Sequence, residues 1–159
     1  MSYNSILEAI KTNSEINPGK LCVGDKKNKE TYGQFWKMIN KGAAYLEKNG
    51  VKKGDVVVLR GAQKVEYLFS IFSIQLLGAI ACPLEKAVKE DRILEIMNFV
   101  ETKYFLDTKK LKDTSAECIS LKEMFKEAMN DETECDVNKY ELPKSDDLSE
   151  ILFTTGTTG

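Results

Sequence analysis

Residues 56–83 read VVVLRGAQKVEYLFSIFSIQLLGAIACP, and the alternation of elements within them determines the fold class. Val56–Leu59 is apolar and β-branched, as is typical of a strand that is buried on both faces of a parallel sheet. Lys64–Leu77 is apolar on nearly all sides and has the length of a buried helix. A glycine then ends the helix, and Ala79–Cys82 predicts a second strand, which the following proline is expected to stop.

The same pattern continues toward the C-terminus. Asp91 precedes apolar residues at positions 93, 96, 97 and 100, which this spacing places on one face of a helix. Tyr104–Leu106 predicts a third strand. Strands that are joined through helices by short connections form right-handed crossovers. The sequence therefore predicts an α/β fold with a doubly wound, mainly parallel sheet and helices on both faces.

Three Ser/Thr-x-x-Glu/Gln patterns predict helix starts outside this unit. The patterns begin at Ser5, Thr31 and Ser120, and the predicted helices run through Ile10, Asn49 and Ala128. Short strands are expected at residues 21–23, 30–31 and 118–119. Residues 130–147 are polar and acidic and predict a surface connection, and Ile151–Phe153 predicts one more buried strand.

Composition excludes several classes of function. The 159 residues include 23 basic and 25 acidic ones, and a net charge of -2 lacks the electrostatic signature of a general nucleic-acid binder. The chain contains no histidine, which excludes Ser-His-Asp catalysis and His-containing zinc sites within it.

The four cysteines, at positions 22, 82, 118 and 135, form no C-x-x-C pair. We find no pattern of a signal peptide, and polar residues interrupt the longest apolar stretch, so no membrane span is expected. The expected location is the cytoplasm.

The last six residues, Thr154–Gly159, have the composition of a phosphate-binding loop that follows a strand. Glycine lets the backbone approach an anion, and threonine hydroxyls add hydrogen-bond donors. Ligands of open α/β sheets bind at the carboxyl ends of the strands. The spacing fits neither the Walker pattern nor G-x-G-x-x-G, so a small-residue tail without function is the alternative from these residues alone.

Residues 147–159, DLSEILFTTGTTG, resemble the ATP phosphate-loop motif of the adenylate-forming enzymes, with Thr155 in place of the common serine. This superfamily includes acyl-CoA synthetases, adenylation domains of nonribosomal peptide synthetases and luciferases. Four further segments resemble motifs of the family in the same order: residues 31–35, 50–57, 77–84 and 91–100.

The resemblance implies a ligase that uses ATP and Mg²⁺ to convert a small carboxylic acid into an acyl adenylate. It further implies an acyl-CoA synthetase-like, AMP-forming enzyme that transfers the acyl group to a thiol of CoA or phosphopantetheine. The residues implied to bind the ATP phosphates are Thr154, Thr155, Gly156, Thr157, Thr158 and Gly159. No catalytic residue and no metal ligand of the family falls within this chain.

On this resemblance, residues 1–159 are expected to be part of the N-terminal subdomain, cut within the phosphate loop and inactive alone. A non-catalytic nucleotide-binding or interaction module is the alternative. An N-terminal part alone is expected to expose apolar surface near residues 64–77, which favours a homo-oligomer.

Overall fold

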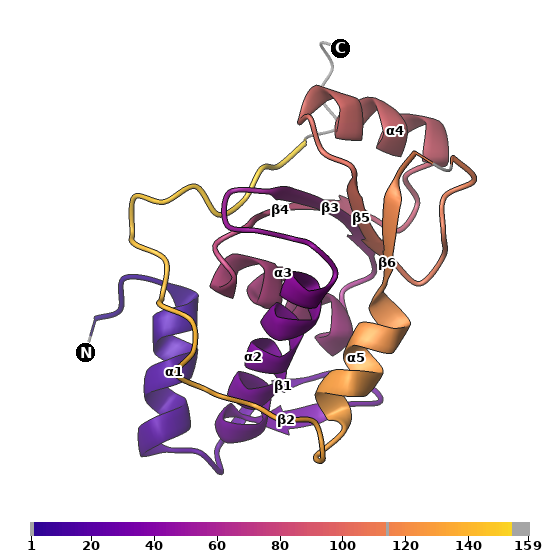
Figure 1. The fold of residues 1–159 in the computed structure, drawn as a ribbon. Helices are drawn as coiled ribbons and strands as arrows, with labels where there is room; N and C mark the ends of the chain where they lie inside the picture. Colours follow the sequence, from indigo (N-terminus) through magenta and orange to yellow (C-terminus); the bar gives the residue numbers. More distant parts are fainter. Residues whose placement is uncertain (1, 114, 154–159) are drawn as a thin grey trace.

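The computed structural model describes residues 2–113 and 115–153. Eleven elements follow one another along these residues (Figure 1). The helices are α1 (Ile6–Ile16), α2 (Tyr32–Lys48), α3 (Val65–Leu76), α4 (Glu90–Phe99) and α5 (Leu121–Met129). The strands are β1 (Leu21–Gly24), β2 (Lys29–Thr31), β3 (Val56–Gly61), β4 (Ile80–Glu85), β5 (Tyr104–Asp107) and β6 (Glu117–Ser120).

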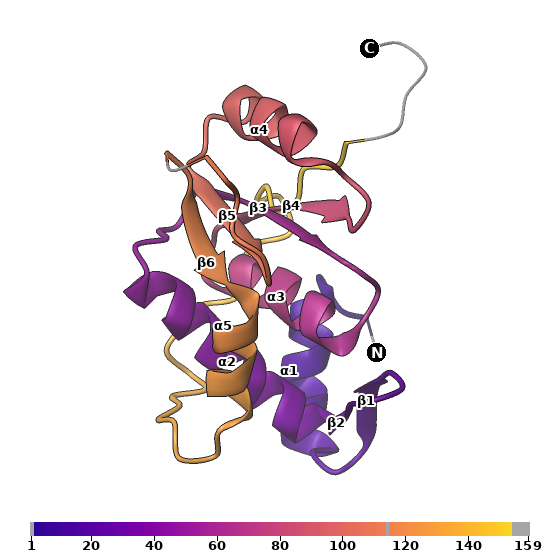
Figure 2. The same cartoon turned by 90° about the vertical axis from the view of Figure 1, so that its right-hand side faces the viewer.

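Four of the strands form a parallel sheet in the order β4-β3-β5-β6, and β1 and β2 form a separate antiparallel hairpin. The chain crosses from β3 to β4 in one direction and from β4 to β5 in the other. Because both crossovers keep the same hand, the reversal of direction places α3 and α4 on opposite faces of the sheet. Figure 2 shows α4 alone above the sheet and α2, α3 and α5 below it. The predicted doubly wound fold is confirmed.

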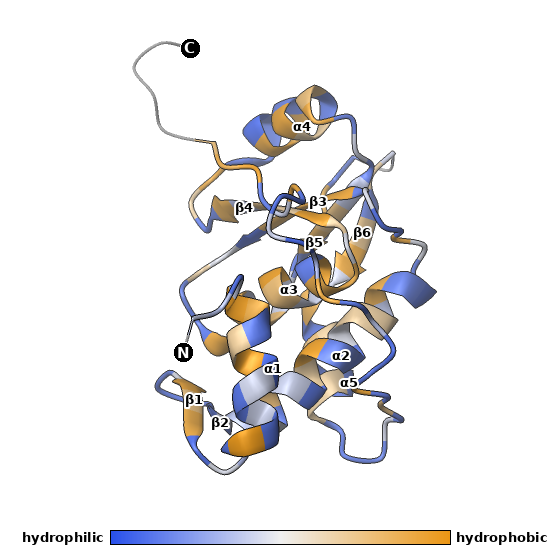
Figure 3. Cartoon of the chain, turned by 90° about the vertical axis from the view of Figure 1, so that its left-hand side faces the viewer, coloured by the Kyte–Doolittle hydropathy of each residue, from blue (hydrophilic) through white to orange (hydrophobic). Residues whose placement is uncertain are grey.

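The sheet separates two hydrophobic cores. The larger core joins the sheet to α1, α2, α3 and α5, and the smaller one lies under α4. Val57 and Val58, neighbours in β3, belong one to each core, and both are fully buried. The predicted burial of this strand on both faces is therefore confirmed, and hydrophobic residues colour much of the sheet and of α3 in Figure 3.

Only one of the three predicted helix starts is a complete capping box. Thr31 Oγ1 accepts from the backbone N–H of Gln34 at 3.2 Å, and the Gln34 side chain accepts from the Thr31 N–H at 2.9 Å. The Ser5 and Ser120 hydroxyls each accept a hydrogen bond from the backbone N–H three residues later, but the glutamate side chain at that position does not accept one from the serine N–H. The helix that begins after Ser5 also runs to Ile16, past the predicted end at Ile10.

The sequence predicted that Pro83 would end its strand, and this prediction is wrong. The N–H that proline lacks would lie on the outer side of β4, away from β3. Ala81, two residues earlier, directs its N–H and C=O away from β3, to Ser149 and Ile151. Residues two apart in a strand direct these groups to the same side. Pro83 therefore leaves the pairing with β3 intact, and β4 continues to Glu85.

The prediction of a buried strand at Ile151–Phe153 is wrong. Within the described residues this segment makes a single parallel bridge, between Glu150 and Ala81. Since Pro83 has no N–H to donate to Ile151, the ladder does not continue. Leu152 is 67% exposed.

Residues 130–149 run across the surface as a mostly hydrophilic segment (Figure 3). Three of its side chains, Val137, Tyr140 and Leu142, nevertheless pack against the larger core. Lys139 forms an ion pair with Glu47 of α2 at 2.8 Å. None of the helices in the described ranges is long and apolar enough to cross a bilayer.

Candidate functional site

The segment that precedes the Thr/Gly stretch lies along the outer edge of β4. The Ala81 N–H donates to the carbonyl of Ser149, and the Ile151 N–H donates to the carbonyl of Ala81, both at 2.9 Å. Because the two segments are parallel, residues 149–153 run toward the carboxyl ends of the sheet strands. In sheets of this class that edge is where ligands bind.

Phe153, at the end of this segment, makes two aromatic contacts with α4. The Phe153 ring meets Phe99 of α4 edge to face, with ring centroids 5.8 Å apart. The Arg92 guanidinium lies 5.9 Å from the centre of the same ring. The six residues that the sequence predicts to hold the ATP phosphates, Thr154–Gly159, lie outside the described residues.

An Arg–Asp pair joins two strands at the carboxyl edge. Arg60 of β3 and Asp107 of β5 follow the aligned residues Leu59 and Leu106. The Arg60 Nε donates to Asp107 Oδ2 at 3.0 Å, and the ion-pair distance from Nη2 to the same oxygen is 2.9 Å. Arg60 Nη1 donates to the carbonyl of Val88 at 2.7 Å, so one guanidinium ties β3, β5 and the loop after β4 together.

Sequence reasoning missed this pair, although the signal was present. Arg60 is one of only two arginines in the chain, and it directly follows the apolar run Val56–Leu59. Asp107 follows the apolar run Tyr104–Leu106 in the same way. Because the carboxyl ends of parallel strands lie at one edge, charged residues that follow such runs are brought together.

A cleft of about 300 Å³, which we call the carboxyl-edge cleft, opens beside this pair and has an excess of positive charge. Since Arg60 and Asp107 neutralise each other, the remaining charged residues that line the cleft are Lys64, Lys86, Lys109 and Glu66. Three lysines against one glutamate favour an anionic ligand.

Tyr67 also lines the cleft, and its hydroxyl donates to the carbonyl of Leu84 at 3.0 Å. Burial raises the pKa of this tyrosine to about 12, so the hydroxyl keeps its proton at neutral pH. Tyr67 is therefore suited to hold the end of β4 in place and unsuited to act as a base.

The described residues offer no obvious nucleophile or metal site. All four cysteines are unpaired thiols, and burial raises the pKa of Cys82 to about 11, so this thiol is protonated at neutral pH. Within residues 2–113 and 115–153, no group of three Cys, Asp or Glu side chains is arranged to hold a metal ion. The site described here can thus attract and position an anion.

Sequence comparison matches residues 10–159 to the family described as AMP-binding enzyme. The chain is 29% identical to the nonribosomal peptide synthetase tcpP of Claviceps purpurea. The aligned region covers 98% of this chain and 8% of the synthetase. It is 24% identical to the D-alanine–D-alanyl carrier protein ligase of Bacillus licheniformis, over 97% of this chain and 30% of that one.

Solved structures share the fold. The N-terminal subdomain of Klebsiella oxytoca NpsA in complex with 3-hydroxybenzoyl-AMSN superimposes with a TM-score of 0.84 at 20% identity, covering 98% of this chain and 38% of that one. O-succinylbenzoate coenzyme A synthetase of Bacillus subtilis in complex with AMP gives a TM-score of 0.80 at 17% identity, over 94% and 39%. The chain thus spans less than half the length of the relatives it matches.

Proposed function

Because the chain belongs to the AMP-binding enzyme family, we propose that it forms part of an ATP-dependent ligase that activates a carboxylic acid. A carboxylate oxygen attacks the α-phosphorus of ATP, the acyl adenylate forms and pyrophosphate leaves. A thiol then attacks the acyl carbon and AMP leaves. The observation that carries the proposal is the stretch Asp147–Gly159, a phosphate-loop sequence whose first part pairs with β4.

In this proposal the chain's own contribution is to bind the nucleotide. The backbone N–H groups and hydroxyls of Thr154–Gly159 donate hydrogen bonds to the phosphates of ATP. Mg²⁺ that is bound with the ATP neutralises part of the phosphate charge. The remainder of residues 1–159 forms the first part of the N-terminal subdomain, with residues 130–147 as an acidic surface connection.

The thiol acceptor is CoA or phosphopantetheine. One similar protein is named as a carrier protein ligase and another as a coenzyme A synthetase. CoA and phosphopantetheine both carry phosphate, and the lysines of the carboxyl-edge cleft support such a ligand. The subtype that we propose is acyl-CoA synthetase-like. Four unpaired thiols support a reducing compartment, and we propose the cytoplasm.

ATP–pyrophosphate exchange with a panel of carboxylic acids tests the proposal. We expect no exchange by residues 1–159 alone, and exchange once the chain is extended by the sequence that follows it in the gene. Gly156→Asp in the extended protein is expected to lower the exchange rate about 100-fold, because it would add a negative charge to the loop proposed to bind the phosphates. Gly19→Asp is the control, since the structure leaves open space around Gly19. Exchange that survives Gly156→Asp would contradict the assigned loop.

The alternative, a nucleotide-binding or interaction module without catalysis, predicts different results. Calorimetry of residues 1–159 with ATP and Mg²⁺ separates the two. Micromolar binding by this chain, together with no exchange in the extended protein, would favour the module. Exchange in the extended protein would exclude it.

A further inference from the structure

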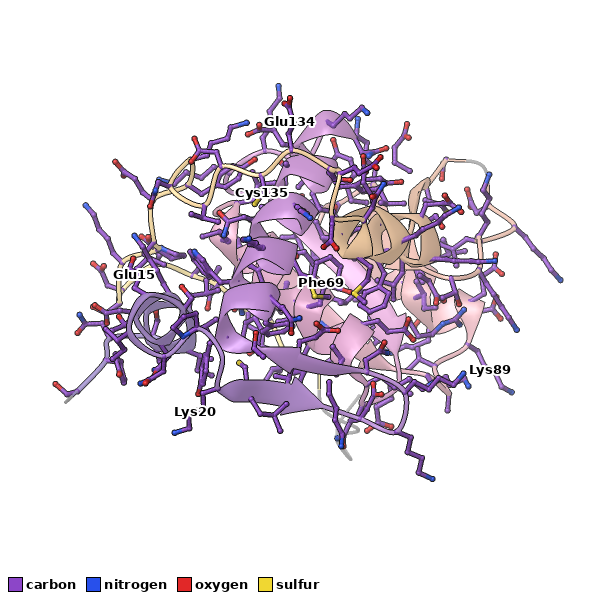
Figure 4. The ribbon with its side chains drawn as sticks, turned by 90° about the horizontal axis from the view of Figure 1, so that it is seen from below. Glu15, Lys20, Phe69, Lys89, Glu134 and Cys135 are labelled. Carbon is purple, nitrogen blue, oxygen red and sulfur yellow. The ribbon has the colours of Figure 1, made fainter. Side chains whose placement is uncertain are left out.

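A groove of about 710 Å³ follows α2 on the side of the molecule remote from α4 and is separate from the carboxyl-edge cleft. Figure 4 shows this side, with α2 running between α1, which carries Glu15, and α5. Residues of both neighbouring helices line the groove, together with Glu30 of β2 and Trp36 and Met38 of α2.

Glu30 is an unusual residue for a groove of this kind. It is only 7% exposed, and no described residue donates a hydrogen bond to its side chain or forms an ion pair with it. Burial alone raises the pKa of its carboxyl, with no opposing effect of a nearby cation. The carboxylate oxygens are nevertheless open to the groove, so a cation bound there would pair with a partly desolvated carboxylate.

The buried lysine that lines the groove has a different partner. Lys41 also lines the groove and is 8% exposed. Its ammonium donates to the backbone carbonyl of Asn130 at 2.9 Å, just beyond the end of α5. The groove therefore holds one cation at its α5 end and leaves the Glu30 carboxylate open to another.

We propose that this groove binds a guanidinium group, with the Glu30 carboxylate as its partner. A guanidinium presents a planar pair of donors that matches both carboxylate oxygens, and it loses less hydration than an ammonium on burial. Met129, which is 43% exposed, offers apolar contact to the carbon chain that carries the guanidinium, and the nearly buried Trp36 and Met38 lie behind the groove wall. Three acidic and two basic residues line the groove, so its net charge is negative and favours a cation.

The single tryptophan of the chain provides the readout, because Trp36 lines the groove. N-acetyl-arginine amide is titrated into residues 1–159 while the tryptophan fluorescence is recorded. We expect a saturable change with a dissociation constant on the order of 1 mM, as for one desolvated ion pair and its stem. N-acetyl-citrulline amide, which has the same shape without the charge, should give no saturable change.

Glu30→Gln is expected to weaken binding at least tenfold, whereas Glu117→Gln on β6 should leave it unchanged. The glutamine variant should unfold at an equal or higher temperature than the parent, since it removes a carboxylate that is partly desolvated in the folded state. If Glu30→Gln does not fold, Glu30→Asp, which withdraws the carboxylate by one methylene, should weaken binding instead. No saturable response to the arginine amide, an equal response to the citrulline amide, or unchanged affinity in the Glu30 variant would each overturn the proposal.

The source of the guanidinium is decided by a third arm. An acetylated and amidated peptide, Gly-Gly-Arg-Gly-Gly, is compared with agmatine. Tighter binding of the peptide by tenfold or more would identify a protein segment as the ligand. Equal or tighter binding of agmatine would identify a small guanidine, and both outcomes uphold the assigned chemistry.

Discussion

Single side chains connect parts of this molecule that are far apart in the sequence. Asp25, in the loop of the β1–β2 hairpin, accepts hydrogen bonds from the backbone N–H groups of Lys27 and Asn28. Its other oxygen accepts from the N–H of Val65, in the first turn of α3, at 2.9 Å. Because Lys64 provides no side-chain cap, Asp25 caps α3 from another element.

Asp25→Asn is expected to lower the melting temperature by a few degrees at pH 7, because an amide has only one acceptor oxygen for three donors. The bond from Val65, followed by those from Lys27 and Asn28, lowers the pKa of Asp25 to about 2. The ionised Asp25 therefore stabilises the folded protein at pH values above about 4, the pKa of an aspartate in the unfolded chain. This stabilisation is lost as the pH falls toward 2.

The difference between the parent and Asp25→Asn should therefore shrink between pH 4 and pH 2. Thermal unfolding followed by circular dichroism at pH 7, 4, 3 and 2 measures it. Asp131→Asn, at an exposed carboxylate, is the control and should match the parent at every pH. A constant difference down to pH 2 would contradict the role of the carboxylate charge.

The two arginines provide a matched pair for a second prediction. Arg60→Gln leaves Asp107, whose side chain is only 10% exposed, without its cation, and should lower the free energy of unfolding by about 2 kcal/mol. Arg92 pairs with Glu95 at the surface, with side chains 54% and 67% exposed, so Arg92→Gln should change it by less than about 0.5 kcal/mol. Urea denaturation measures both values, and equal effects would refute the distinction.

At the scale of elements, the contact between α2 and α3 depends on a missing side chain. A Cβ at Gly42 would lie 2.1 Å from Ser73 Oγ and 2.8 Å from the Phe69 ring. Ser73 and Phe69 are fully buried, and the Ser73 hydroxyl donates to the Phe69 carbonyl at 2.7 Å. Figure 4 shows Phe69 at the centre of the helical layer, beside α2.

Gly42→Ala is therefore expected to destabilise the protein by about 2 kcal/mol through overpacking. Helix propensity by itself predicts the opposite sign, a gain of about 1 kcal/mol. Gly19→Ala, where the space is open and φ is not positive, should be neutral or slightly stabilising. Chemical denaturation decides the sign, and a more stable Gly42→Ala variant would show that the helices separate at little cost.

At the scale of the whole molecule, large apolar side chains are exposed near α4 and the segment beside β4. Phe99 is 76% exposed and Leu152 is 67% exposed, whereas α3 itself exposes only Leu68, at 40%. The apolar surface expected at residues 64–77 is thus found mainly elsewhere. Oligomer formation stays a prediction.

Light scattering of residues 1–159 over a concentration series tests it. We expect the apparent mass to rise with concentration, because contact with a second copy would remove these two exposed side chains from water. Phe99→Ser combined with Leu152→Ser should abolish the rise. Ile6→Ser on α1, which removes an equally exposed side chain from a remote position, should not. A monomer at the highest concentration would refute self-association.

The sequence by itself determined the order of the elements and the family. Apolar runs and helical spacing report which face of each element is buried, and this local information predicted β3, α3 and β4 to within a few residues. The same information failed at Pro83 and at Ile151–Phe153, because the outcome there depends on which side of a strand is paired. Strand pairing depends on two segments at once, so it cannot be predicted from the residues of one segment alone.

Tertiary structure alone decided the Arg60–Asp107 pair, the capping of α3 by Asp25 and the burial of Glu30. Each joins segments that are distant in the chain, and each depends on strand register or helix packing. The proposed phosphate loop is the reverse case, since the proposal rests on the residue types at 154–159. Backbone N–H groups and hydroxyls suit phosphate by their own chemistry, whereas the role of a charged side chain depends on its neighbours in the fold.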